Sequence, residues 1–401
     1  MVELTTIVEN GTANQAKIRN IRALIAYWIL GLCNNYGYVV MLTAAADIID
    51  RFSEESETSQ VRDCTYMSTG VVLLADVIPC LVIKIFGPFL PFFVNVRVGL
   101  NICLACTSFL LVAFSDSMTL AILGVIFTSF SSGLGEITFL QYSSFYNKNV
   151  VSTWSSGTGG AGVFGALSYA LLEAIGLRNA LLTMLIIPIT TAVSFWIILP
   201  KPSEGENSQN VEMQKEINAV DLKSPLESLK IKLRILPGLL KYMIPVGLVY
   251  LFEYFINQGL FELIDFKDTF VDKKGQYRWL QVTYQVGVLI SRSSVNLFHI
   301  RKIYILAILQ LVNVVIYTTQ VIYFYIPSFY IVIALTLWEG MLGGGAYVNT
   351  FYTISTEVEE DKKQFSMAIT SFADSCGIAL AGVFAVLAHN KICDVPIPDY
   401  A

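Results

Sequence analysis

Charge is the property that this sequence has least of. Only 14% of its 401 residues are Asp, Glu, Lys or Arg, whereas a soluble globular chain carries about 25%. Hydrophobic residues make up 55% of the chain. This composition excludes an ordinary soluble domain and indicates a protein that crosses the membrane several times.

The side chains and motifs of common enzymes are also scarce. The chain has two histidines and contains no GxSxG motif, no Walker loop and no HExxH motif. Its seven cysteines are scattered, and "CLAC" at 103–106 lies inside an apolar run, where a metal or redox role is not expected. The glycines of "GTGGAG" at 157–162 follow no strand, so they suit close helix packing rather than dinucleotide binding. We predict no cofactor, no metal site and no enzyme activity.

Long apolar runs are what the sequence has in abundance. An α-helix needs about 20 residues to cross a bilayer, and its backbone groups must be hydrogen-bonded within the segment, so these runs predict helices. Residues 1–22 contain no apolar core, so we expect the first membrane helix to direct insertion. The runs predict about eleven transmembrane helices, at 23–46, 65–86, 92–114, 119–145, 157–176, 180–199, 238–262, 278–298, 303–325, 329–352 and 366–388.

The distribution of basic residues favours a cytosolic N-terminus. In that orientation the cytosolic segments hold most of the Lys and Arg, and the first loop on the other side, "DIIDRFSEESETSQVRD", is acidic. Eleven spans then place the C-terminus in the lumen. A basic lumenal loop around Lys273 and Lys274 reduces the asymmetry, so the side of the C-terminus and the choice between eleven and twelve spans stay open.

Weak internal similarity relates the two halves of the chain. Three pairs of motifs lie six spans apart: "NYG" at 35–37 and "NQG" at 257–259, "GLGE" at 133–136 and "LGGG" at 342–345, and "AGVFGAL" at 161–167 and "AGVFAVL" at 381–387. Two helical repeats around a long central loop are typical of major facilitator transporters.

We therefore expect an all-α membrane protein with a major-facilitator-like, two-bundle architecture. Its predicted parts are a cytosolic tail at 1–22, a six-helix bundle at 23–199, a cytosolic linker at 200–237, a five-helix bundle at 238–388 and a tail at 389–401.

The linker contains one predicted helix, in "SPLESLKIKLRILPGLL". Ser224 and Glu227 can form a capping box, and Pro225 suits the first helical position. Leucines share one face of this helix, beside lysines and an arginine that favour anionic headgroups. The segment predicts either a helix on the membrane surface or an ordinary linker helix between the bundles.

Ionisable side chains inside the apolar runs are functional candidates, because a charge in the bilayer is costly. Any one of these residues can instead serve only in a buried ion pair or in packing. Burying all of them for packing alone would be too costly, so the set as a whole favours a substrate or proton pathway. Arg292 can bind a phosphate or carboxylate of a substrate, extend to the membrane surface or pair with an acid. The candidates are Asp76, Glu136, Glu253, Arg292, Glu339 and Asp374.

A polar stripe follows the stretch "YLFEYFINQGLFELIDF" at 250–266. Glu253 and Asn257 are four residues apart and share one helix face, and Gln258 starts a second such pair with Glu262, which lies near the lumenal end where water can reach it. The stripe predicts a water-filled cavity, and we expect Asn35 of the matching "NYG" motif to line it.

Four long motifs resemble the battenin family, the Batten-disease protein and its fungal relatives. They are "LGLCNNYGYVVMLTAAADII" at 30–49, "EYFINQGLFEL" at 253–263, "QYRWLQVTYQVGVLISRSS" at 276–294 and "EGMLGGGAYVNTFYTI" at 339–354. The resemblance extends over about 25–390. It implies a multi-pass protein of the vacuolar or lysosomal membrane, tied to vacuolar pH homeostasis, arginine transport and glycerophosphodiester export. The prenylated cysteine box that ends animal members is absent, since "DVPIPDYA" follows Cys393.

We expect an alternating-access transporter of the vacuolar membrane. Its partners would be the lipid bilayer, a small polar substrate (a glycerophosphodiester or a basic amino acid) and protons exchanged at Glu136 or Glu253, with no nucleic acid. Two alternatives stay open: a membrane scaffold that regulates the vacuolar proton pump or trafficking, and an intramembrane enzyme that acts on lipid headgroups.

Overall fold

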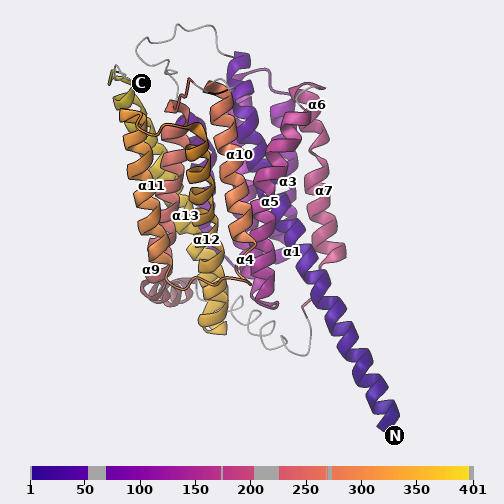
Figure 1. Cartoon of the computed structure of the whole chain (residues 1–401). Helices are drawn as coiled ribbons and strands as arrows, with labels where there is room; N and C mark the ends of the chain where they lie inside the picture. Colours follow the sequence, from indigo (N-terminus) through magenta and orange to yellow (C-terminus); the bar gives the residue numbers. More distant parts are fainter. Residues whose placement is uncertain are drawn as a thin grey trace.

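The computed structural model describes residues 2–52, 69–172, 175–202, 225–267, 269 and 273–396, and these ranges contain helices and no strand (Figure 1). The acidic loop after residue 52, Ser224, and the side chains of Glu262, Lys273 and Lys274 lie outside the described part. The helices are α1 (Val2–Phe52), α2 (Thr69–Phe86), η1 (Gly87–Phe89), α3 (Val94–Ala113), α4 (Met118–Ser143), α5 (Asn149–Leu172), α6 (Leu177–Thr183), α7 (Ile186–Val193), η3 (Ser194–Ile198), α9 (Pro225–Phe255), η4 (Ile256–Leu260), η5 (Phe261–Leu263), α10 (Lys273–Arg292), α11 (Ile303–Tyr323), α12 (Phe329–Glu357) and α13 (Glu360–Cys393).

In the part of the chain that the structure describes, eleven helical segments cross the bundle, as the apolar runs predict. One of them consists of α6, α7 and η3, and another of α9, η4 and η5. Eight helices of the described ranges are long and apolar enough to span a membrane by length and composition alone. The two termini lie at opposite ends of the bundle, as an odd number of crossings requires (Figure 1).

Several helices begin or end away from the edges of their apolar runs. α1 begins at Val2 rather than near 23, and its first part projects beyond the bundle (Figure 1). α5 begins at Asn149 rather than near 157, and α10 ends at Arg292 rather than near 298. Hydropathy detects only the part of a helix that lies in hydrocarbon, whereas a helix with capped or solvated ends can continue through polar turns.

The helices pair in the same way in the two halves. α1 packs against α4 and α5 as α9 packs against α12 and α13, and α3 packs against α4 as α11 packs against α12. Between the halves, α2 contacts α13, and α10 contacts α5. The structure therefore has the predicted major-facilitator-like, two-bundle architecture, and we propose that the bundles divide within 200–237.

The predicted linker helix is not separate from the next span. α9 continues from Pro225 to Phe255 with Pro237 and Pro245 inside it. Its first turns lie across the end of the bundle, at an angle to the rest, which agrees with the kink that a proline introduces (Figure 1). Leu226 is 71% exposed and Leu233 is 47% exposed, which favours the predicted surface helix over a helix packed between the bundles.

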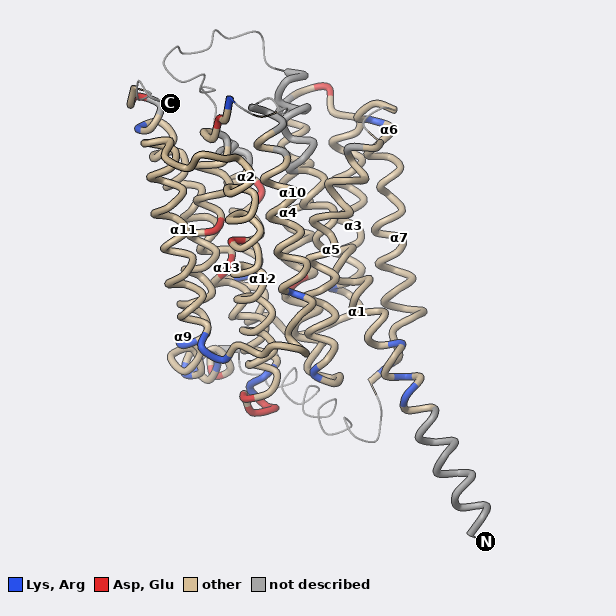
Figure 2. Tube along the Cα trace, viewed as in Figure 1, with Lys and Arg blue, Asp and Glu red and all other residues tan. Residues whose placement is uncertain are grey.

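Apolar and charged side chains are distributed as a bilayer requires. Large hydrophobic side chains remain exposed on the outer faces of helices, among them Val96 on α3, Ile308 on α11 and Leu387 on α13. Lys and Arg gather mainly at the end of the bundle from which the N-terminus projects, and several acidic residues lie in its interior (Figure 2). The interior acids need partners that the outer surface cannot supply.

Candidate functional site

An ion cluster around Lys84 joins the two bundles. Lys84 Nζ on α2 lies 2.7 Å from Glu136 Oε2 on α4 and 3.0 Å from Asp374 Oδ1 on α13. The three side chains are 3%, 10% and 6% exposed, respectively. Ser375 also donates a hydrogen bond to Asp374 Oδ1, at 3.0 Å. A buried cation between two carboxylates compensates their charges, and the ion pair between α2 and α13 ties the first bundle to the second.

Tyr347 on α12 extends this cluster. Its hydroxyl donates to Glu136 Oε1 at 2.9 Å and accepts from Trp154 Nε1 on α5 at 3.3 Å. The carboxylate of Glu136 therefore has a partner at each oxygen. The Tyr347 ring also receives the guanidinium of Arg292, whose Cζ lies 4.3 Å from the ring centre, a cation–π contact.

Arg292 lies at the end of α10 and is 9% exposed. It donates to the Thr158 hydroxyl on α5 at 2.7 Å and to the Tyr250 hydroxyl on α9 at 2.8 Å, so it also links the bundles. A Cβ at Gly159 would lie 3.3 Å from Arg292 Cδ, so the missing side chain at 159 gives Arg292 room beside α5. Its Nε has no hydrogen-bond partner among the described residues. Burial and these contacts disagree with extension to the membrane surface, and no ion pair of Arg292 is found in the described part of the chain.

Glu253 and Glu339 form a different group, inside the second bundle. Glu253 is 1% exposed and accepts a hydrogen bond from the Tyr284 hydroxyl at Oε1. Glu339 is 0% exposed and accepts from Gln310 Nε2 at 3.3 Å. In each carboxyl group the other oxygen, Oε2, has no partner among the described residues. A Cβ at Gly343 would overlap the carboxyl group of Glu253 where it now lies, so the glycine gives this carboxyl group room beside α12.

The other predicted residues lie in separate places. Asp76 on α2 is 1% exposed, and neither of its carboxylate oxygens has a partner within the described ranges. Asn35 on α1 is half-buried and accepts a hydrogen bond from Asn34 at 3.2 Å. Asn257 and Gln258 lie in η4, a π-helical turn, and Asn257 is 2% exposed whereas Gln258 is half-buried. The π turn changes the α-helical spacing on which the predicted stripe rests.

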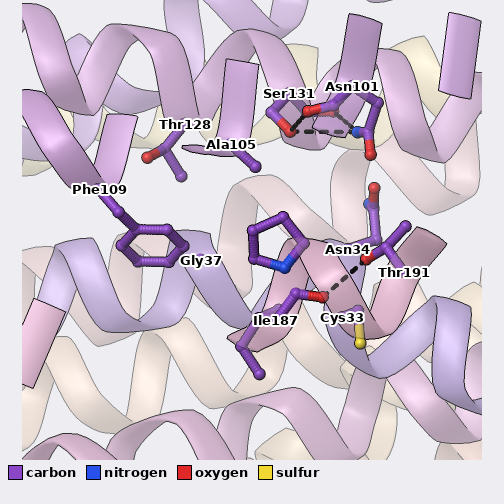
Figure 3. A pocket seen from close by; sticks show the side chains of 11 residues that line it. Cys33, Asn34, Gly37, Asn101, Ala105, Phe109, Thr128, Ser131, Ile187 and Thr191 are labelled. Atoms are coloured by element: carbon purple, nitrogen blue, oxygen red, sulfur yellow. Dashed lines mark hydrogen bonds between the residues drawn. The ribbon is translucent and has the colours of Figure 1, made fainter. Parts of the chain in front are cut away.

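A small cavity lies inside the first bundle and not between the bundles (Figure 3). Its volume is about 20 Å³, room for roughly one water molecule and too little for a substrate. Asn34 lines it, and Asn101 donates to the Ser131 hydroxyl at 3.1 Å. The lining residues are Cys33, Asn34, Gly37, Asn101, Ala105, Phe109, Thr128, Ser131, Ile187, Pro188 and Thr191.

The structure thus brings Glu136 and Asp374 together around Lys84. The sequence analysis did not predict Lys84 as a site residue. Arg292 is the only basic residue among the predicted candidates, although Lys84 lies within the apolar run 65–86 and Arg97 within the run 92–114. The signal for Lys84 was its spacing, because Asp76, Cys80 and Lys84 recur every four residues and share one face of α2. Arg97 serves the turn between α2 and α3, where it donates to the carbonyl groups of Gly87 and Leu90.

Comparison with solved structures shows the fold. The chain superposes on the major facilitator superfamily proton:xylose symporter XylE with a TM-score of 0.63 and 13% identity, over 93% of this chain and 90% of that one. It superposes on the human organic anion transporter MFSD10 (TETRAN) with a TM-score of 0.57 and 11% identity, over 93% and 96% of the two chains. At such identities the likeness shows the fold alone.

Comparison of sequences shows the family. Battenin of Canis lupus familiaris is 41% identical over 400 residues, which cover 92% of this chain and 91% of that protein. Protein btn1 of Aspergillus fumigatus is 32% identical over 421 residues, which cover 93% and 88% of the two proteins. The family model described as CLN3 protein matches residues 25–228 and 206–395. The chain therefore belongs to the CLN3 protein family.

Proposed function

We propose that this protein is an alternating-access transporter of the vacuolar or lysosomal membrane, with its N-terminus in the cytosol. The observation that carries the proposal is the cluster of Lys84, Glu136, Asp374, Tyr347 and Arg292, to which both bundles contribute. A solute that binds between the bundles has to meet these groups. The bundles can move apart only if the contacts between them break, and a bound solute can replace the contacts that are lost.

The proposed substrate is a small polar molecule with an anionic group. The phosphate of a glycerophosphodiester can compete with Glu136 and Asp374 for Lys84. It can also accept a hydrogen bond from Nε of Arg292, which has no partner among the described residues. A basic amino acid is the second candidate, because its carboxylate suits the same cations and its own cationic side chain suits the two acids. We propose that effects on vacuolar pH follow from this transport.

Weaker contacts surround the cluster and would also have to part. Ser156 on α5 and Ser293, just after α10, lie 2.8 Å apart, and Asn296 donates to Ser152 at 3.4 Å. Neutral hydrogen bonds of this kind contribute only about 1 kcal/mol each. They can therefore close the interface without locking it.

Flux measurements in proteoliposomes that contain only this protein test the proposal. Labelled glycerophosphodiester and labelled arginine are offered, with and without a pH gradient. We expect saturable flux of one of them, lost in Arg292→Gln and kept in Arg178→Gln, which removes a charge of the same sign from an exposed position on α6. No flux of either solute, with folded protein in the membrane, would refute transport and favour a scaffold that regulates the proton pump or trafficking. Chemical turnover of a lipid headgroup would favour an enzyme instead.

A further inference from the structure

The buried acids outnumber the buried cations that face them. Five carboxyl groups of the spans are buried, those of Asp76, Glu136, Glu253, Glu339 and Asp374. Lys84 compensates Glu136 and Asp374 through direct ion pairs. Within the described ranges, none of the other three acids, Asp76, Glu253 and Glu339, forms an ion pair. An isolated carboxylate in an apolar interior is too costly to persist, so it takes up a proton or binds a cation.

Glu253 and Glu339 are placed to act as one unit. They come from α9 and α12, which pack together, and their charges repel one another. Their hydrogen-bond donors, the Tyr284 hydroxyl and the Gln310 amide, are neutral. Each carboxyl group also keeps one oxygen without a partner, while its side chain is at least 99% buried. Neutral donors can hold a protonated carboxyl group, but they do not compensate two negative charges.

Among the described residues, the charged and titratable groups that act on the pair include a single cation. Tyr250 and Tyr254 face Glu253 along α9, Tyr284 and Arg292 face it from α10, and Asp374 faces it from α13. Tyr284 and Tyr317 of α11 face Glu339. Arg292 acts on Glu253 without touching it, since its own hydrogen bonds go to Thr158 and Tyr250. It can balance one of the two acids and not both.

We propose that Glu253 and Glu339 form a proton-binding site in the second bundle, and that an anionic substrate at Arg292 drives proton uptake by Glu253. The second part rests on the proposed transport function. An anion bound to Arg292 withdraws the positive charge that balances Glu253, so the carboxylate gains a proton from water. Proton and anion binding thereby favour each other, by linkage. Transport is then cotransport of an anion with a proton, while Lys84 keeps its ion pairs with Glu136 and Asp374.

Carbodiimide labelling tests the proton site without any transport assay. Dicyclohexylcarbodiimide enters apolar regions and reacts with protonated carboxyl groups, and mass spectrometry of peptides locates the adducts. In the purified, unmodified protein without ligand we expect adducts at Glu339 and, once the pH is lowered, also at Glu253, but not at Glu136 or Asp374. As the pH rises through the titration of the site, labelling should fall by about tenfold per pH unit.

Three results would overturn the proton site. The first is that both acids stay unlabelled at every pH, and the second is that the adducts fall on Glu136 or Asp374 instead. The third is protection by sodium ions at constant pH, which would make the pair a sodium site. Lys84→Met is the control for access of the reagent, because it leaves Glu136 and Asp374 without their cation and should make at least one of them reactive.

Proton uptake on binding tests the link to substrate. Glycerophosphoglycerol, an anionic glycerophosphodiester, is added to weakly buffered protein in detergent with a pH-sensitive dye. We expect uptake of up to about one proton per bound ligand, and its loss in Glu253→Gln while binding persists. Binding without proton uptake in the unmodified protein would refute the link and leave the proposed function standing. Absence of binding, with labelling as expected, would refute the proposed anionic substrate and with it this link, and keep the proton site.

Discussion

Replacing Lys84 by methionine is the most direct perturbation of the interface between the bundles. Methionine keeps most of the length and volume of the buried stem and removes the charge. Glu136 and Asp374 then face each other without a cation, at side-chain exposures of 10% and 6%. The variant should be less stable than the unmodified protein, and the loss should be greatest where both carboxyl groups are ionised.

The magnitude follows from the two ion pairs. At the observed separations of 2.7 and 3.0 Å, each attraction amounts to roughly 6 kcal/mol at an effective dielectric constant of about 20. Desolvation of the three groups offsets much of this attraction. Removal of one partner from a buried pair costs about 3–5 kcal/mol, and we expect a loss in this range at neutral pH. The loss should shrink at low pH, because protonation neutralises the two carboxyl groups that Lys84 no longer balances.

Thermal unfolding of the purified variants in detergent measures this effect. The Tm of Lys84→Met should lie well below that of the unmodified protein and should recover as the pH is lowered. The triple variant Lys84→Met, Glu136→Gln, Asp374→Asn should recover much of the loss at neutral pH, because no charge is left uncompensated. A Tm for Lys84→Met that equals the unmodified value at neutral pH would refute the ion cluster.

Three further predictions concern a close helix contact, Arg292 and a loop histidine. Gly157→Ala should lower the Tm, because the added Cβ would collide with the backbone oxygen of Trp28 on α1, whereas Gly99→Ala, with nothing within 4 Å, should not. Equal Tm values for the two variants would contradict the α1–α5 contact. Arg292→Lys keeps the charge but loses the planar guanidinium that reaches hydroxyls on two helices. The flux should therefore fall at least about tenfold, with the Tm kept. Unchanged flux would exclude a bidentate role of Arg292. The pKa of His299 is lowered from 6.5 by partial burial and by a neighbouring arginine. Protonation of this ring therefore opposes the folded state, and the small stabilisation by the neutral ring is lost as the pH falls below about 6.5. An NMR titration midpoint above 6.5 would contradict this.

The sequence indicates which acids are buried but not which residues they pair with. Every acid that the apolar runs marked as costly, from Asp76 to Asp374, is buried in the structure. Lys84 lies near the end of its run, where a lysine is normally expected to reach the membrane surface. Its partner Asp374 lies 290 positions away, and no local pattern relates the two residues.

The sequence by itself predicted about eleven crossings and the two-bundle arrangement. The reason is that hydrocarbon demands about 20 apolar residues per crossing and leaves the backbone no alternative to the helix. The repeated motifs around 35–37 and 257–259 added the relation between the halves, and the equivalent helix pairs of the two bundles agree with it.

Only the tertiary structure decided which buried acids are compensated. Burial is a property of one segment and can be read along the chain, whereas an ion pair depends on how two helices rotate and approach each other. That rotation places Lys84 between Glu136 and Asp374 and leaves Glu253 and Glu339 with neutral donors. A difference of a few ångströms in packing thus separates the acids that hold the bundles together from those that we propose bind protons.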